Sequence, residues 1–424
     1  MWKRCSRVAA VMVLFTGTAL AGEGHQQHDH GPVDLGKLGN VTFQVSCRGA
    51  QNEFSRAVAM MHSFWYVEAE KAFQKITAKH PRCAMAHWGM AMANYHPLWA
   101  PPTANELQRG RAAAEAAMAL RAGNARERGF IEAIHAFFSD SDRADHATRT
   151  ARYEAAMAKV AAARPRDREA QIFYARALLG SASPNDKTYT KQKQAAEILY
   201  AILPHEREHP GVAHYIIHSY DYPQLAPLAL DAARAYAKIA PGSPHALHMP
   251  SHIFTRLGLW DESIASNRDS AEKARMYIRQ VNPNATSFDE LHAIDYLVYA
   301  HLQQADDAAA AALVDRLSKA DAPLLDINNF AAAYAYAATP ARYALERRQW
   351  KEAAELELRP SNFPWKDHAP AEAIHHFAKA IGAARTGDLN VAKAAVDRLA
   401  EIQRGLKGYW AEQVEIQRLA AQST

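Results

Sequence analysis

Apolar residues recur at helical spacing through most of this 424-residue chain, in long stretches built from Ala, Leu, Glu, Arg, Lys and Gln. Gly is scarce inside these stretches, and no run alternates with the period of two that a half-buried strand requires. Several of the stretches end at a proline, as residues 152–165 and 228–241 do. The pattern predicts an all-α fold.

A short turn pattern recurs between the helical stretches. In residues 258–264 a glycine and an aromatic residue precede an acidic pair and a small residue. A related arrangement returns at 348–354, where an aromatic residue precedes an acidic and a small residue, and, more weakly, at 386–392. The small residues Ser263, Ala308 and Ala353 follow one another at equal spacing. Over roughly residues 50 to 420 the chain therefore resembles the tetratricopeptide-repeat superfamily. That resemblance implies a right-handed superhelical solenoid of helix-turn-helix repeats, with the first helix of each repeat on the concave face.

Other segments resemble, more narrowly, an uncharacterised group of bacterial and fungal tetratricopeptide-domain proteins. The segments are residues 38–47, 62–66, 83–89 and 245–258. This resemblance implies a fold and brings no catalytic residues with it. We expect one solenoid over residues 38–424, closed by a capping helix at 408–421.

The N-terminus has the features of an export signal. Lys3, Arg4 and Arg7 precede an apolar run from Val8 to Leu20, and Ala19-Leu20-Ala21 fits a cleavage site. The run is too short to span a bilayer as an anchor. We therefore expect a signal peptide at residues 1–21, a periplasmic or secreted protein, and a disordered His-rich tail at residues 22–37.

The net charge limits the kinds of binding partner, and the cysteines indicate a disulfide. The formal net charge of +4 would fall to +1 on loss of the three basic residues of the signal, and clusters of Lys and Arg are missing. We expect neither nucleic acid binding nor membrane insertion. Cys47 and Cys83 would remain, and in an oxidising compartment a disulfide is favoured over a pair of thiolate ligands.

Two histidine-dense segments are the candidate functional site. His214 and His218 are four residues apart, and His245, His248 and His252 follow at spacings of three and four, so each set falls on one helical face. If these segments are first helices of adjacent repeats, the two sets face each other. Asp221, one turn beyond His218, would be a further ligand or a hydrogen-bond partner of a ligand.

A third segment adds His292, which shares a helical face with Asp289 and Tyr296. His292 could complete a mononuclear site, and nearby carboxylates could support a dinuclear one. All-imidazole ligation suits copper or zinc, and mixed imidazole–carboxylate ligation suits zinc, manganese or iron. The structural alternative is that Tyr, Ser and Asp side chains satisfy each ring without an ion.

An aromatic group near the N-terminus is a further candidate. His62, Trp65, Tyr66, Trp88 and Tyr95 belong to it. It could form a ligand pocket, but an aromatic core between hairpins is the favoured interpretation.

The sequence thus predicts an exported protein with a transition-metal site (zinc, copper or iron) in its concave groove. The ligands would be His214, His218, His248 and His252, with His245, His292 and Asp221 as further ligands or their partners. An open coordination position would make the site catalytic by activating water or oxygen. Haem-attachment, phosphate-loop and serine-elbow motifs are missing, so reaction type stays open. The alternative function is a metal-free scaffold that binds a peptide or partner protein in the groove.

Overall fold

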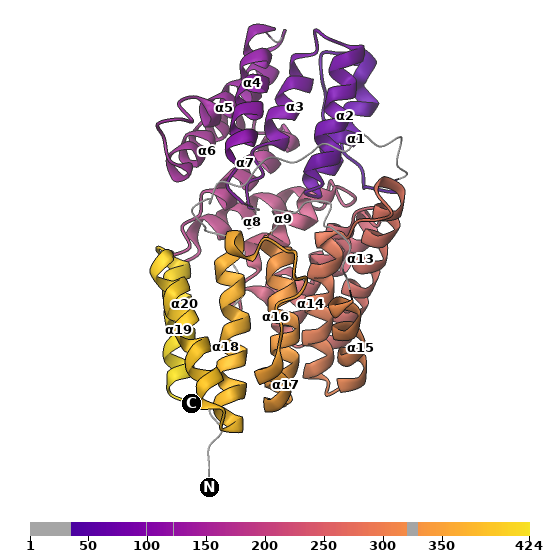
Figure 1. Ribbon diagram of the computed structural model, residues 1–424. Helices are drawn as coiled ribbons and strands as arrows, with labels where there is room; N and C mark the ends of the chain where they lie inside the picture. Colours follow the sequence, from indigo (N-terminus) through magenta and orange to yellow (C-terminus); the bar gives the residue numbers. More distant parts are fainter. Residues whose placement is uncertain (1–34, 99, 122, 320–329) are drawn as a thin grey trace.

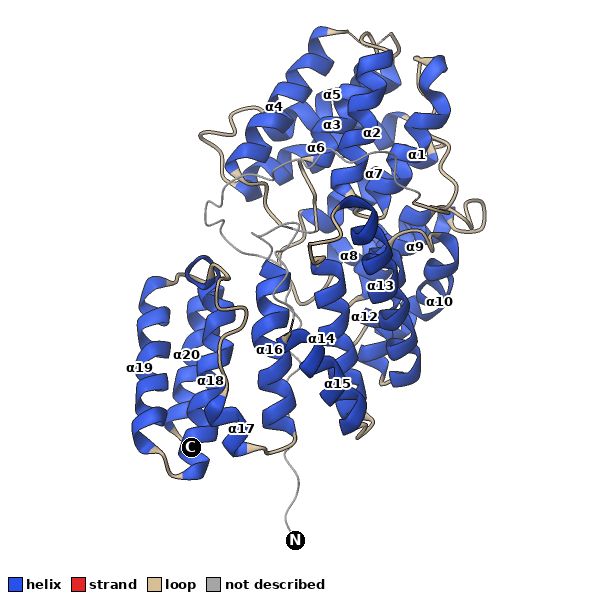
Figure 2. Ribbon diagram, turned by 45° about the vertical axis from the view of Figure 1, so that its right-hand side comes forward, coloured by secondary structure: helices blue, strands red, loops and turns tan. Residues whose placement is uncertain are grey.

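The computed structural model describes residues 35–98, 100–121, 123–319 and 330–424. Throughout these ranges the regular elements are helices, with no strand (Figure 2). The predicted all-α fold is confirmed. The predicted signal peptide and most of the His-rich tail lie outside the described residues, whereas Leu35 is buried and Lys37 forms an ion pair with Glu208.

The helices alternate along the chain between two sets, and each packs on the next. One set contains α1 (Gln51–His62), α3 (Ala84–Ala93), α5 (Ala125–Phe138), α7 (Arg168–Gly180), α9 (Pro210–Tyr220), α11 (Pro244–His248) with α12 (Pro250–Leu257), α14 (Phe288–Gln303), α16 (Phe330–Glu346), α18 (Ala369–Thr386) and α20 (Tyr409–Gln422). The other contains α2 (Tyr66–Lys79), α4 (Ala104–Ala119), α6 (His146–Ala163), α8 (Thr190–Ile202), α10 (Leu230–Ile239), α13 (Trp260–Val281), α15 (Asp307–Ser318), α17 (Trp350–Glu355) and α19 (Leu389–Gly405). Short 3-10 turns occur at η1 (Arg48–Ala50), η2 (Ala226–Ala229) and η3 (Trp365–His368).

Members of the first set also contact the next member of that set. Contacts of this kind join α7 to α9, α9 to α12, α11 to α14, and α14 to α16. Figure 1 shows α1–α7 at one end of the molecule, α13–α20 at the other, and α8 and α9 between them. Helices α9, α11, α12 and α14 therefore form a continuous row in the middle of the protein.

Local sequence signals set the helix ends. Thr103 and Glu106 form a reciprocal capping box at the start of α4, and the side chains of Asn124 and Asp145 accept hydrogen bonds from the first turns of α5 and α6. Each such cap stabilises a helix by about 1 kcal/mol because it satisfies an unpaired amide of the first turn. At the other end, Gly258 closes α12 with a positive φ of 70°, a conformation that costs other residues energy.

The first helix of the chain packs against the middle of the row. Helix α1 contacts α9, and the His62 Nδ1 lies 2.9 Å from the Tyr215 hydroxyl. A Cβ atom added at Gly211 would lie 2.6 Å from that Nδ1, so the glycine is what allows the His62 ring to approach α9. This contact brings the end of α1 beside His214.

The core of the N-terminal half is aromatic. Phe43, Phe54, Phe73, Trp88 and Phe130 are fully buried, and the Phe43 and Trp88 ring centroids are 5.2 Å apart. Tyr95 is fully buried as well. The aromatic group near the N-terminus is thus, at Trp88 and Tyr95, part of this core. Within the described residues, no helix has the length and apolar character needed to cross a membrane.

A disulfide joins Cys47 to Cys83, as the sequence predicts. It ties the segment before η1 to the start of α3, and its sulfurs are therefore not thiolate ligands. The two cysteines are 36 residues apart. Closing a loop of this length in the unfolded chain stabilises the native state by about 3–4 kcal/mol.

Replacing both cysteines by serine should therefore lower the free energy of unfolding by about 3–4 kcal/mol, measured by urea denaturation. Reductant should destabilise the wild-type protein by a similar amount and leave the double variant unchanged. A double variant as stable as the wild type would contradict this.

Candidate metal centre

Six histidines from four neighbouring helices meet in the middle of the molecule. Helix α9 carries His214 and His218, α11 carries His245 and His248, α12 carries His252 and α14 carries His292. They form two groups, and within each group one ligand atom per residue lies within 4.8 Å of the others. We call His214, His218 and His245 the first group, and His248, His252 and His292 the second group.

The division into two groups differs from the single site expected around His214, His218, His248 and His252. Helix α11 ends at His248, and Pro250 begins α12, because a proline can start a helix but cannot continue its hydrogen-bond ladder. His245 faces His214 on α9, with the two Nε2 atoms 3.2 Å apart, whereas the His248 ring lies 4.4 Å from that of His292 on α14. One short helix thus supplies a ligand to each group.

The first group centres on His214. Its Nδ1 lies 2.6 Å from the His62 carbonyl oxygen, which can only accept, so this nitrogen carries the proton. The Nε2 of His214 therefore has a lone pair, and it lies 3.1 Å from the Nε2 of His218 and 3.2 Å from that of His245. One lone pair faces two nitrogens at nearly equal distances, which is the arrangement of three ligands around a common point.

Aromatic rings enclose this group. Phe64, in the turn between α1 and α2, stacks on the rings of His218 and His245 with centroids 5.3 Å away in both cases. Tyr236 stacks on His214 from the other side at 4.9 Å. The rings hold the imidazoles in place and remove water from around them.

In the second group, hydrogen bonds to Asn267 and Asp221 fix a proton on the Nδ1 of His248 and of His252. Asn267 donates from Nδ2 to the Ser263 carbonyl at 2.9 Å, so its Oδ1 faces His248 and accepts from the His248 Nδ1 at 2.6 Å. Asp221 likewise accepts from the His252 Nδ1 at 2.8 Å. Both rings therefore carry a proton on Nδ1, which leaves the His248 Nε2 with a lone pair. The His252 Nε2 faces it at 3.0 Å.

Asp221 lies outside both groups and holds a ligand in place. Its second oxygen accepts from the Arg256 Nε at 2.5 Å. Burial alone would raise the pKa of Asp221, but His252 and Arg256 outweigh it and lower the pKa to about 2. A permanent carboxylate behind a histidine fixes the ring orientation and increases its basicity, as is usual for metal-bound histidines.

His292 completes the second group from α14, and the carboxylates of that helix do not join it. The Tyr296 ring stacks on His252 at 5.3 Å and lies 5.3 Å from the His292 ring. Asp295 forms an ion pair with Arg342 instead. Asp289 is not among the grouped ligand atoms, and burial raises its pKa to about 7.

Burial favours the neutral form of five of these imidazoles. It lowers the pKa of His218 to about 3 and that of His292 to about 4. The pKa values of His214, His245 and His248 also fall well below the ordinary value for the same reason, with the neighbouring histidines adding to the effect. Neutral imidazole is the form that binds a metal ion.

A third group was not anticipated from the sequence. His62, Glu169 and His209 are all buried, and the Glu169 oxygens lie 3.4 Å from the His62 Nε2 and 3.0 Å from the His209 Nε2. Burial would raise the pKa of Glu169, but the two histidines lower it below its usual range. The only sequence signal was His209 directly before the Pro210 that begins α9, since nothing marks Glu169. The carboxylate accepts from two rings and so anchors His62, whose carbonyl orients His214.

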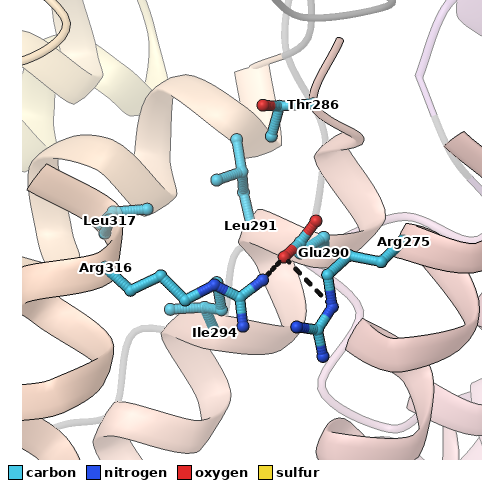
Figure 3. A pocket seen from close by; sticks show the side chains of 7 residues that line it. All are labelled: Arg275, Thr286, Glu290, Leu291, Ile294, Arg316 and Leu317. Atoms are coloured by element: carbon cyan, nitrogen blue, oxygen red, sulfur yellow. Dashed lines mark ion pairs between the residues drawn. The ribbon is translucent and has the colours of Figure 1, made fainter. Parts of the chain in front are cut away.

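A pocket of about 300 Å³ lies elsewhere, beside the start of α14. Figure 3 shows Arg275 and Arg316 converging on Glu290, with Thr286 at the edge. Both arginines pair with the one carboxylate, and no histidine is among the lining residues. It therefore offers less chemistry than the histidine groups.

Comparison with models of known protein families found no match to this chain, and comparison with curated proteins found no significant similarity.

Proposed function

We propose that this chain is an exported, tetratricopeptide-like helical-repeat protein that binds two transition-metal ions, one in each three-histidine group. One observation carries the proposal. The Nε2 atoms of His248 and His252 face each other across 3.0 Å, and the Nδ1 of each ring already donates to Asn267 or Asp221. A cation that both nitrogens can bind stabilises this arrangement.

A metal ion fits that requirement better than a proton. A proton can be shared by only two nitrogens, whereas a metal ion can also bind the ring of His292, which belongs to the same group. Nitrogens bound to one zinc ion at ~2.0–2.1 Å and tetrahedral angles lie ~3.3–3.4 Å from each other. The Nε2 separations of 3.0 to 3.2 Å in both groups are within a few tenths of an ångström of this value.

The ligand chemistry favours copper. Both groups consist of neutral imidazoles alone, without a thiolate or carboxylate. Iron in such sites usually takes a carboxylate as well, whereas copper and zinc accept imidazole alone, and copper binds nitrogen ligands more tightly than zinc. Three protein ligands leave a coordination position open on each ion, which is the arrangement of catalytic rather than structural sites.

Other features support the rest of the proposal. The two alternating helix sets and the glycine turn before α13 fit tetratricopeptide-like hairpins. The basic and apolar N-terminus fits export, and the disulfide fits an oxidising compartment.

Elemental analysis of tag-free protein tests the proposal. We expect two ions per chain after exposure to copper. His218→Ala should retain one ion through the second group, and His252→Ala should retain one through the first. These two histidines lie at the partly exposed edge of their groups, so the substitutions leave the core intact.

The exposed His205 supplies the matched control, and His205→Ala should keep both ions. A folded protein that takes up neither copper nor zinc would overturn the proposal. The histidines would then be structural, and the peptide-binding scaffold would be the remaining function.

A further inference from the structure

We propose that the two ions act as one coupled dicopper unit that binds dioxygen between them. This inference rests on the proposed function and adds the substrate and the redox chemistry of the same site.

The two groups adjoin each other through one short helix. His245 belongs to the first group and His248 to the second, and they are three residues apart on α11 with ring centroids 6.3 Å apart. Residues at this spacing share a helix face, with Cβ atoms about 5–6 Å apart. The two groups therefore adjoin each other, and one small bridging ligand would require their ions to lie about 3.5–4 Å apart, as functional metal pairs commonly do.

The two groups contain no carboxylate or thiolate among their ligand atoms. This composition favours copper ions that react with dioxygen. Two divalent ions held by six neutral rings would place four positive charges in a largely buried site, at a high desolvation cost. Two cuprous ions halve that charge. When dioxygen takes one electron from each, the products are two cupric ions and a bridging peroxide dianion, so the net charge of the centre is unchanged.

That step balances without another reactant. Each Cu(I) gives one electron, dioxygen receives two, two copper–oxygen bonds form at the open positions, and no proton moves. The side chains of His218, His252, His292 and Tyr296 are partly exposed, whereas His214, His245 and His248 are buried. Each ion would therefore lie between buried and solvent-exposed side chains, and dioxygen could reach it from the solvent side.

The test loads full-length protein with two equivalents of Cu(I) without oxygen and measures bound copper first. Dioxygen is then admitted, and its uptake and the Cu(II) electron paramagnetic resonance signal are recorded. We expect one dioxygen per two coppers and almost no Cu(II) signal, because a shared bridge couples the two unpaired electrons. Acid should then release one hydrogen peroxide per two coppers.

Different results would overturn the metal site and the coupled copper centre. Less than one copper per chain before oxygen is admitted overturns the metal site itself. Two bound coppers that give two full, independent Cu(II) spins, or that do not react with oxygen, overturn only the coupled centre. His292→Ala should bind one copper and give one full Cu(II) spin after oxidation, whereas His205→Ala should behave as the wild type.

Discussion

Lowering the pH from about 7.5 to about 5.5 should cost the metal-free protein about 9 kcal/mol of unfolding free energy. The reason is that burial strongly lowers the pKa values of eight histidines below the ordinary 6.5: His62, His146, His214, His218, His245, His248, His292 and His375. In the unfolded chain each takes up a proton as the pH falls through 6.5, and in the native state none does. Their stabilising contribution is present above pH 6.5 and is lost progressively below it.

The magnitude follows from proton counting. Each histidine that protonates only in the unfolded state costs about 1.4 kcal/mol over this interval, or about 11 kcal/mol for eight. Asp289 opposes them, because burial raises its pKa to about 7 and the native state then binds a proton that the unfolded chain does not. Protonation of Asp289 in the native state adds about 2 kcal/mol to the unfolding free energy over the same interval. The net loss of unfolding free energy is a large part of the 5–15 kcal/mol that stabilises most proteins.

Bound metal should reverse much of this loss. An ion that binds only the native state at a thousand times its dissociation constant adds about 4 kcal/mol. Urea denaturation of metal-free and copper-loaded protein at both pH values measures both effects. His205→Ala should leave the pH dependence unchanged, whereas His292→Asn should reduce it by about one histidine's share. Equal stability of the metal-free protein at the two pH values would show that these rings are not buried and neutral.

The sequence predicts the helices and the ligand types, because both depend on local spacing. The intervals between His214 and His218 and between His248 and His252 are enough to place each pair on one face. It does not predict the division into two groups, which depends on α11 ending at His248.

The residues that hold the ligands are the least predictable part. Asn267 fixes the His248 ring from α13, and His62 meets His214 from a helix 152 residues earlier in the chain. A polar side chain or a carbonyl in such a position has no local pattern, since its role arises from packing between distant helices. Asp221 was recognisable because it lies one turn beyond His218, yet the structure pairs it with His252 on the neighbouring helix.

Replacing Asp221 by asparagine should weaken metal binding in the second group by about 10–100-fold and leave the first group nearly unchanged. The carboxylate accepts from the His252 Nδ1 and from Arg256, and so keeps the Nε2 lone pair of His252 directed at the second group. An asparagine is nearly the same size but has one acceptor oxygen instead of two. It cannot accept from both donors in the same way, and it removes the negative charge that increases the basicity of His252.

Competition with a coloured copper chelator measures the two affinities separately, and only the second should fall. The matched control is Asp142→Asn, because Asp142 also accepts from an arginine, Arg111 at 3.0 Å, but is 81% exposed and far from histidine ligands in sequence. If Asp221→Asn weakened both groups equally, the two sites would bind as one cooperative unit. If it weakened neither, the orientation of His252 would come from the packing of Tyr296 against its ring and not from the carboxylate.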